Sequence, residues 1–182
     1  MSKTLKILIV RFSSIGDIVL TTPVIRSLKH HLNTQVHFLT KHRYHSILAN
    51  NPNVDKVFYL GDSLFQVIKD LKEEKYDYII DLHNNLRSRS LILLGTTIKR
   101  YSKSNFKKFI YMKFGINYLN NTHVVDRYMD AIKFLGLTND NQGLDYYIDP
   151  KVDVDFNIDQ RFVAWNIGAS QTQKKLSVSQ VS

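Results

Sequence analysis

The sequence predicts an α/β fold, a Rossmann-like and mostly parallel sheet with helices on both faces. Three observations predict it. Short apolar, β-branched runs recur along the chain, helix-like stretches separate them, and 182 residues with 43% hydrophobic content suffice for one domain with a sizeable core. Strands that alternate with helices favour parallel pairing, because each right-handed crossover returns the chain to the same edge of the sheet.

Five strands are expected in this domain. They cover Leu5–Phe12, Gln35–Thr40, Lys56–Leu60, Tyr76–Leu82 and Ile98–Tyr101. Two later helices are marked by apolar residues spaced three or four positions apart. The first carries Leu64, Val67, Ile68 and Leu71 behind Asp62 or Ser63 as its cap, and the second spans Val125 to Leu135 and ends at Gly136.

The turn after the first strand, SSIGD, predicts a helix that runs from Ile18 with Asp17 as its cap. Pro23, in the following TTP, indicates a restart or kink of this helical region.

The domain organisation is predicted from a change in composition. Residues 1–137 form the Rossmann-like domain, and the polar, acidic segment 138–160, with Gly143 and Pro150, is expected to connect it to a second one. A new strand, Arg161–Asn166, opens residues 161–182, which hold only that strand and part of a turn. Because so little chain cannot bury a core, the second domain is expected to be truncated.

The composition indicates the kind of partner and the compartment to expect. The net charge of +9, from 25 Lys and Arg against 16 Asp and Glu, favours anionic partners. There is neither a run of about 18 apolar residues nor a secretory signal pattern. The absence of cysteine excludes disulfides and thiolate metal sites and agrees with a reducing compartment, so a cytoplasmic location is expected.

The densest positive stretch, residues 98–114, interleaves lysine and arginine with aromatic residues. This pattern is typical of single-stranded nucleic-acid binding or of a lipid interface. It is equally compatible with a solvated helix face whose aromatic side chains point into the core.

Candidate site residues follow from the geometry of a parallel sheet, whose ligands lie outside the carboxyl ends of the strands. The turns expected there are SSIGD, KHRY, GDS and HNNLRS. In the first, Gly16 permits a tight turn, and Asp17 either caps the helix or accepts a proton from a hydroxyl nucleophile. Its carboxylate argues against a phosphate at this helix N-terminus.

In the turn after the fourth strand, Arg87 offers donors for a carboxylate or phosphate, and His83, Asn84 and Asn85 offer neutral hydrogen bonds of the kind that sugar hydroxyls accept. The alternative is that Asn85 caps the next helix and Arg87 faces solvent. His123 and Arg127 share a helix face at i and i+4, which alone does not indicate a site. No HExxH, cysteine pair or carboxylate cluster has metal-ligand spacing, so no metal site is expected.

Five ordered blocks resemble glycosyltransferase family 9, the ADP-heptose:lipopolysaccharide heptosyltransferases. They are ILIVRFSSIGDIVLTTPVIRSLK, NPNVDKVFYL, YDYIIDLHNNLRS, HVVDRYM and VAWNIGAS with KKL. The similarity runs over essentially all 182 residues. It implies a GT-B fold, with two Rossmann-like domains across a cleft, of which this chain carries the N-terminal, acceptor-side half.

The resemblance also implies roles for particular residues. Asp17 corresponds to the catalytic base of an inverting, metal-independent transfer, and Ser13, Ser14 and Gly16 shape the loop around it. Arg87 and Arg127 fall at acceptor-side positions, and Lys174 or its neighbour Lys175 at the donor diphosphate. The chain departs from the family at Ser177, which replaces the usual proline after KKL, and in the nearly absent second domain.

The function implied is transfer of heptose from ADP-heptose to the inner core of lipopolysaccharide, with no cofactor and with this chain inactive alone. The expected partners are the nucleotide-sugar, the anionic core acceptor and the cytoplasmic face of the inner membrane, to which the protein would bind peripherally; no nucleic acid is expected. The alternative is a non-catalytic module that binds anionic glycolipid or nucleic acid through residues 98–114.

Overall fold

The computed structural model describes residues 3–61, 64–102, 122–149, 151–152 and 161. Its contacts divide the chain into two compact units, Met1–Asp149 and Pro150–Ser182. Lys174, Lys175, most of the predicted strand Arg161–Asn166 and residues 103–114 of the basic stretch lie outside the described residues. The predicted domain boundaries therefore stay predictions.

The first unit is built on a five-stranded sheet of order β3-β2-β1-β4-β5, in which every pairing is parallel. Its strands are β1 Leu5–Val10, β2 Thr34–Lys41, β3 Lys56–Leu60, β4 Tyr78–Asp81 and β5 Thr97–Arg100. The five predicted strands and the parallel sheet are confirmed, and no strand end differs from the prediction by more than two residues.

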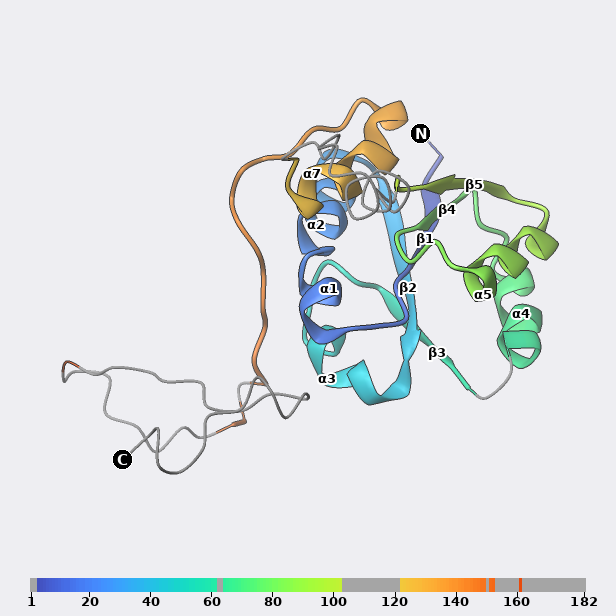
Figure 1. Cartoon of the computed structure of the whole chain (residues 1–182), viewed down its shortest axis with the longest axis horizontal. Helices are drawn as coiled ribbons and strands as arrows, with labels where there is room; N and C mark the ends of the chain where they lie inside the picture. Colours follow the sequence, from blue (N-terminus) through green and yellow to red (C-terminus); the bar gives the residue numbers. More distant parts are fainter. Residues whose placement is uncertain (1–2, 62–63, 103–121, 150, 153–160, 162–182) are drawn as a thin grey trace, which may run out of the picture. The chain divides into compact units, whose positions relative to one another are not determined.

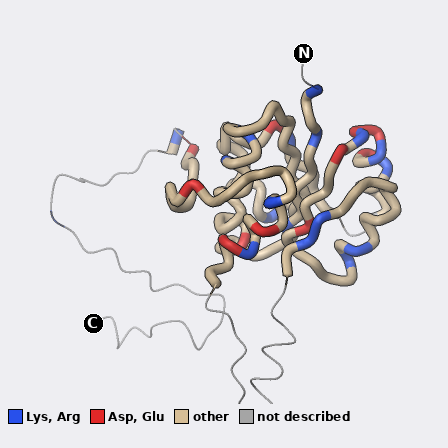
Figure 2. The backbone as a smooth tube through the Cα atoms, turned by 90° about the horizontal axis from the view of Figure 1, so that it is seen from above, with Lys and Arg blue, Asp and Glu red and all other residues tan. Residues whose placement is uncertain are grey.

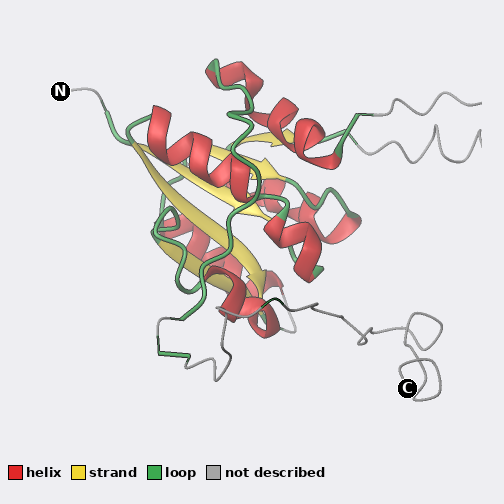
Figure 3. Ribbon diagram, turned by 90° about the vertical axis from the view of Figure 1, so that its left-hand side faces the viewer, coloured by secondary structure: helices red, strands yellow, loops and turns green. Residues whose placement is uncertain are grey.

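Helices cover both faces of the sheet, as predicted (Figures 1 and 3). The α-helices are α1 Ile15–Val19, α2 Thr22–His31, α3 His45–Leu48, α4 Leu64–Glu73, α5 Leu86–Arg89 and α7 Val124–Met129. The 3-10 helices are η1 His42–Tyr44, η2 Ser90–Leu94 and η3 Asp130–Leu135. Within the described ranges, none of the helices is both long enough and apolar enough to cross a bilayer.

Alternation along β1 creates two hydrophobic clusters, because successive strand side chains point to opposite faces. Ile7 and Ile9 join the cluster that contains apolar residues of α1, α2, α3 and α7. Leu8 and Val10 join the cluster that contains residues of α4 and η2. All four side chains are fully buried, which explains why Ile7–Val10 is a continuous apolar run rather than an alternating one.

Two predicted helix boundaries need correction. The helix expected from Ile18 begins at Ile15, because Ser14 has the extended backbone of an N-cap and Asp17 is already helical. The helix predicted for 125–135 is α-helical only as far as Met129 and continues as η3, which ends at Gly136 in the left-handed region, as predicted. The restart at Pro23 is confirmed, since α2 begins at Thr22 with the proline in its first turn.

The segment 138–149, part of the predicted connection, contains neither helix nor strand. Arg26 of α2 binds it through hydrogen bonds and ion pairs. The Arg26 side chain is only 6% exposed. Its Nε and Nη2 each donate to Asp140 at 2.7 Å, Nη2 also donates to the Gly143 carbonyl at 3.1 Å, and Nη1 forms an ion pair with Asp145. The hydrogen bonds from Arg26 lower the pKa of Asp140 to about 2.

We expect Arg26→Met to lower the free energy of unfolding by about 2–4 kcal/mol, because it leaves two largely buried carboxylates without their cation. Urea unfolding measures this change. The triple variant Arg26→Met, Asp140→Asn, Asp145→Asn removes the stranded charges and should recover part of the loss. An Arg26→Met protein that unfolds at the wild-type urea concentration would show that this attachment contributes nothing.

Candidate active site

The candidate site lies at the edge of the sheet where the parallel strands end. SSIGD follows β1, KHRY begins at the last residue of β2, and HNNLRS follows β4, so the predicted convergence of these turns is confirmed. Of the turn GDS after β3, only Gly61 is described, since Asp62 and Ser63, the predicted cap of α4, lie outside the described residues.

Asp17 projects from the first turn of α1 and is held at one oxygen. Its Oδ2 accepts hydrogen bonds from the Ser14 backbone N–H at 3.1 Å and from the Ser14 hydroxyl at 2.9 Å, and it pairs with Arg11 Nη2 at 2.7 Å. The side chain is 35% exposed. Asp17 therefore supports the start of its helix, as the third helical residue rather than as the N-cap, and still faces solvent.

These contacts set the charge of Asp17. Burial raises the pKa of the carboxyl, but the Ser14 hydrogen bonds and the positive charge of Arg11 outweigh it, so the pKa lies below its ordinary value. Asp17 is consequently a carboxylate at neutral pH, and its contacts with Ser14 and Arg11 hold it in position.

Arg11 belongs to the candidate site by its contacts but was not predicted from the sequence. It is 8% exposed; its Nε donates to the Ser13 carbonyl and its Nη1 to the Leu82 carbonyl, each at 2.6 Å, and its guanidinium lies 5.8 Å from the ring centre of Tyr128. One side chain thereby joins the turn after β1 to the end of β4 and to α7. The available signal was a cation placed directly after the apolar run Ile7–Val10.

Ser13 and Gly16 lie on either side of Ser14 and Ile15, and only the tight turn expected at Gly16 differs from the prediction. The Ser13–Ser14 peptide bond is cis. Gly16 lies inside α1 and not in a tight turn, and a Cβ added to it would meet nothing within 4 Å. The backbone conformation at position 16 would therefore accept a residue with a side chain. With glycine there, the space beside the residue before Asp17 stays open.

A buried carboxylate organises the turn after β4. Asp81 is fully buried, and its Oδ1 accepts from the backbone N–H groups of His83 at 3.1 Å and Asn84 at 2.7 Å, while its Oδ2 accepts from the Ser88 hydroxyl at 2.8 Å. Asn85 caps α5 by accepting from the Ser88 N–H at 2.8 Å. The interpretation of Asn85 as a helix cap is confirmed. The hydrogen bonds of Asp81 and Asn85 hold the shape of this turn.

The two predicted acceptor-side arginines lie on opposite faces of the sheet. Arg127 is on α7, whose residue Tyr128 belongs to the same hydrophobic cluster as Ile18 of α1. Burial raises the pKa of Tyr128 to about 12, and the charges of Arg11, Asp17 and Arg127 all act on that hydroxyl. Arg87 is exposed on α5, beside the other cluster.

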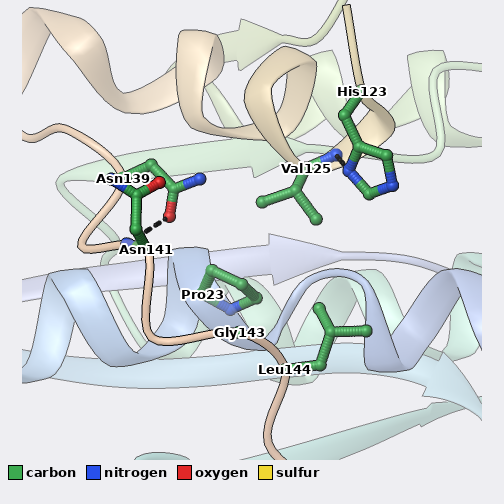
Figure 4. Close-up of a pocket in the computed structure, with 7 residues that line it drawn as sticks. All are labelled: Pro23, His123, Val125, Asn139, Asn141, Gly143 and Leu144. Carbon is green, nitrogen blue, oxygen red and sulfur yellow. Dashed lines mark hydrogen bonds between the residues drawn. The ribbon is translucent and has the colours of Figure 1, made fainter.

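His123 is the N-cap residue of α7. Its Nδ1 accepts a hydrogen bond from the Val125 N–H at 3.3 Å and caps α7 (Figure 4). It also lines a cavity of about 250 Å³ between α2, α7 and the segment after η3. The lining residues are Pro23, His123, Val125, Asn139, Asn141, Gly143 and Leu144. Amide, imidazole and apolar groups of this kind suit a neutral, hydroxylated ligand.

A second cavity, of about 490 Å³, lies at the ends of β2 and β3 and includes Arg87. Its lining residues are Lys41, His42, Arg43, Leu60, Gly61 and Arg87. In the part of the chain that the structure describes, no group of three or more His, Asp or Glu side chains is placed to hold a metal ion.

No protein-family model matches the chain. Lipopolysaccharide heptosyltransferase 1 of Campylobacter coli is 26% identical over 158 residues, which are 81% of this chain and 44% of the relative. Glycosyl transferase family 9 from Veillonella parvula superposes with a TM-score of 0.63 at 22% identity, over 80% of this chain and 45% of that one.

The E. coli heptosyltransferase WaaC, solved with ADP, superposes with a TM-score of 0.58 at 19% identity, over 79% of this chain and 51% of its own. The chain thus spans about half the length of the relatives it matches. Over that half it has the fold of the glycosyltransferase family 9 structures, and the resemblance to this family predicted from its motifs is confirmed.

Proposed function

We propose that the chain is the acceptor-side part of an inverting heptosyltransferase that transfers heptose from ADP-heptose to the inner core of lipopolysaccharide. The observation that carries the proposal is the Asp17 carboxylate, ionised and fixed by Ser14 and Arg11 at the carboxyl end of the central strand. The relatives support the substrate class, since they are heptosyltransferases and one was solved with ADP.

The proposed chemistry is a single displacement. An acceptor hydroxyl donates its proton to Asp17 as its oxygen attacks the anomeric carbon of the heptose. The bond from that carbon to the ADP oxygen breaks, ADP leaves with the electron pair, and the configuration at the carbon inverts. The acceptor would approach the carboxylate past Gly16, where an added Cβ would meet no atom within 4 Å.

The remaining predicted site residues take supporting roles. Arg127, next to Tyr128 on α7, and Arg87, which lines the cavity at the ends of β2 and β3, would bind anionic groups of the acceptor. Lys174 and Lys175 would face the donor diphosphate. No cofactor takes part in the proposed reaction, and the developing charge on ADP would be offset by these cations without a metal.

We place this reaction at the cytoplasmic face of the inner membrane, because its proposed acceptor is lipid-anchored and the chain carries a net charge of +9 that anionic membrane surfaces attract. The alternative, a glycolipid- or nucleic-acid-binding module using residues 98–114, is not favoured by the similarity to heptosyltransferases.

The test is transfer by the protein expressed from its native gene, supplied with ADP-heptose and a heptose-free inner-core acceptor. We expect a product one heptose larger, by mass spectrometry, and an unchanged rate after dialysis against EDTA, because Asp17 and cations replace a metal in the proposed step. GDP-mannose serves as the control donor. A rate that EDTA abolishes and Mg²⁺ restores would overturn metal independence, and the absence of product would overturn the transfer itself.

A further inference from the structure

The cavity between α2, α7 and residues 139–144 has an uncharged lining in a strongly basic protein. Charged residues are spread over many segments of the described chain (Figure 2), yet none of the described residues that line this cavity is a Lys, Arg, Asp or Glu. Arg26 of α2, which binds the same segment, is already paired with Asp140 and Asp145. The lining thus offers a phosphate or carboxylate no cation, and the ligand that fits it is uncharged.

The cavity combines an apolar floor with a polar rim. Pro23 and Val125 are buried, and Figure 4 shows their side chains pointing toward each other, while Leu144, His123 and Asn141 are exposed around them. The volume of about 250 Å³ lies below the range of roughly 300–1,000 Å³ that is usual for drug-sized ligands. A ligand of one small ring, with an apolar face and several hydroxyls, matches both the size and the lining.

Two side chains on the rim supply hydrogen bonds of the kind that hydroxyls need. His123 Nδ1 accepts from the Val125 N–H at 3.3 Å, so in the neutral ring the proton is on Nε2, which can donate to a ligand oxygen. Asn141 donates its backbone N–H to Asn139 Oδ1 at 3.1 Å, and this bond does not use its side-chain amide. That amide both donates and accepts, as a sugar hydroxyl does.

The rim is formed by a loop that the protein itself holds in shape. Asn141 has a positive φ of 57°, in the left-handed region. The backbone N–H of Gln142 donates to Asp140 Oδ1 at 3.1 Å, and that of Asp145 donates to the Thr22 hydroxyl of α2 at 2.9 Å. A ligand therefore does not have to order this loop when it binds, which lowers the entropic cost of binding.

We infer that the cavity between α2, α7 and residues 139–144 binds one uncharged sugar ring. His123 and Asn141 bind the hydroxyls of the ring, and the apolar side chains of Pro23, Val125 and Leu144 contact its C–H face. The inference goes beyond the proposed function, which gives this cavity no role, and it does not depend on sugar transfer.

The test is ¹⁵N–¹H NMR titration of the 182-residue chain with glucose, mannose and galactose. We expect at least one hexose to bind with a Kd of about 1–10 mM and to shift the amides of residues 123, 125, 139, 141, 143 and 144. Cyclohexanol, a ring with a single hydroxyl, should bind at least about tenfold more weakly, and the uronate of the same hexose no more tightly. No shift with any hexose would overturn the site, equal binding of cyclohexanol would overturn the sugar, and tighter binding of the uronate would overturn the uncharged ligand.

Two variants remove the hydrogen-bonding groups and keep the fold. Asn141→Gly deletes the amide, and glycine accepts the positive φ at this position. His123→Asn deletes the ring and keeps an oxygen that caps α7, because asparagine is among the best N-cap residues. Each should weaken hexose binding about three- to tenfold, with an unchanged urea midpoint. The matched control Asn50→Gly, at an exposed asparagine after α3, should bind as the wild type does. Wild-type affinity in the double variant, or equal weakening in the control, would overturn the two assigned residues.

A further arm distinguishes two sources of the sugar. The methyl glycoside of the bound hexose has a blocked anomeric oxygen, as a unit within a glycan has. Affinity equal to that of the free hexose would support a site for a glycan unit, and affinity for the free hexose alone would support a site for a monosaccharide. Neither result depends on heptose transfer, because the titration contains no nucleotide-sugar donor.

Discussion

Asp17→Asn should lower the rate of heptose transfer by roughly 10²- to 10⁴-fold while the protein stays folded. Asparagine has nearly the same shape and keeps a carbonyl oxygen for the Ser14 hydrogen bonds, but it cannot accept the proton of the acceptor hydroxyl. Initial rates with ADP-heptose, measured on the protein expressed from its native gene, report the loss. Because Asp17 is about one third exposed, its ion pair with Arg11 is solvent-screened and the unfolding midpoint should change little.

Asp70→Asn is the matched control for this variant, since it removes one exposed carboxylate from α4 on the other side of the sheet. Its transfer rate should equal that of the wild type. An Asp17→Asn protein that transfers heptose at the wild-type rate would remove Asp17 from the role of base, even if the chain is a heptosyltransferase.

Arg11→Met should reduce kcat/KM for transfer by roughly 10²-fold and move the acid limb of the pH–rate profile to higher pH. The rate falls because Arg11 ties Ser13 and Leu82 to the turn that carries Asp17, and small displacements of a reacting group are costly. The shift has a definite sign: Arg11 helps to hold the pKa of Asp17 below its ordinary value, so without it the carboxylate takes up a proton at a higher pH.

Arg11→Lys separates these two effects. Lysine restores a positive charge near Asp17 and should return the acid limb toward its wild-type position, but it cannot bond Ser13, Leu82 and Asp17 together, so the rate should recover only in part. Arg89→Met, an exposed arginine on α5, is the control and should leave both quantities unchanged. An acid limb that stays in place in Arg11→Met would show that Arg11 has no influence on the charge of the base.

The fold was predictable because each strand and helix is marked by the pattern of residues within its own segment. Runs such as Ile7–Val10 and Val57–Leu60 are apolar and include β-branched residues, and the intervening segments carry helical spacing. The parallel sheet and both helical layers were therefore predictable from the pattern. Helix starts were less predictable: Ser14 and Asp17 are both good capping residues, and only the extended backbone of Ser14 decides between them.

The sequence by itself determined the parallel α/β architecture, the edge at which the turns meet, and Asp17 as a carboxylate at that edge. Only the tertiary structure decided what holds and surrounds it. Arg11 reaches a carbonyl 71 positions away, Arg26 binds an aspartate 114 positions away, and Arg87 borders a cavity with Lys41 and Arg43 from another strand end. Such contacts leave no periodic trace along the chain, because they depend on how separate strands and helices pack rather than on the spacing of neighbours.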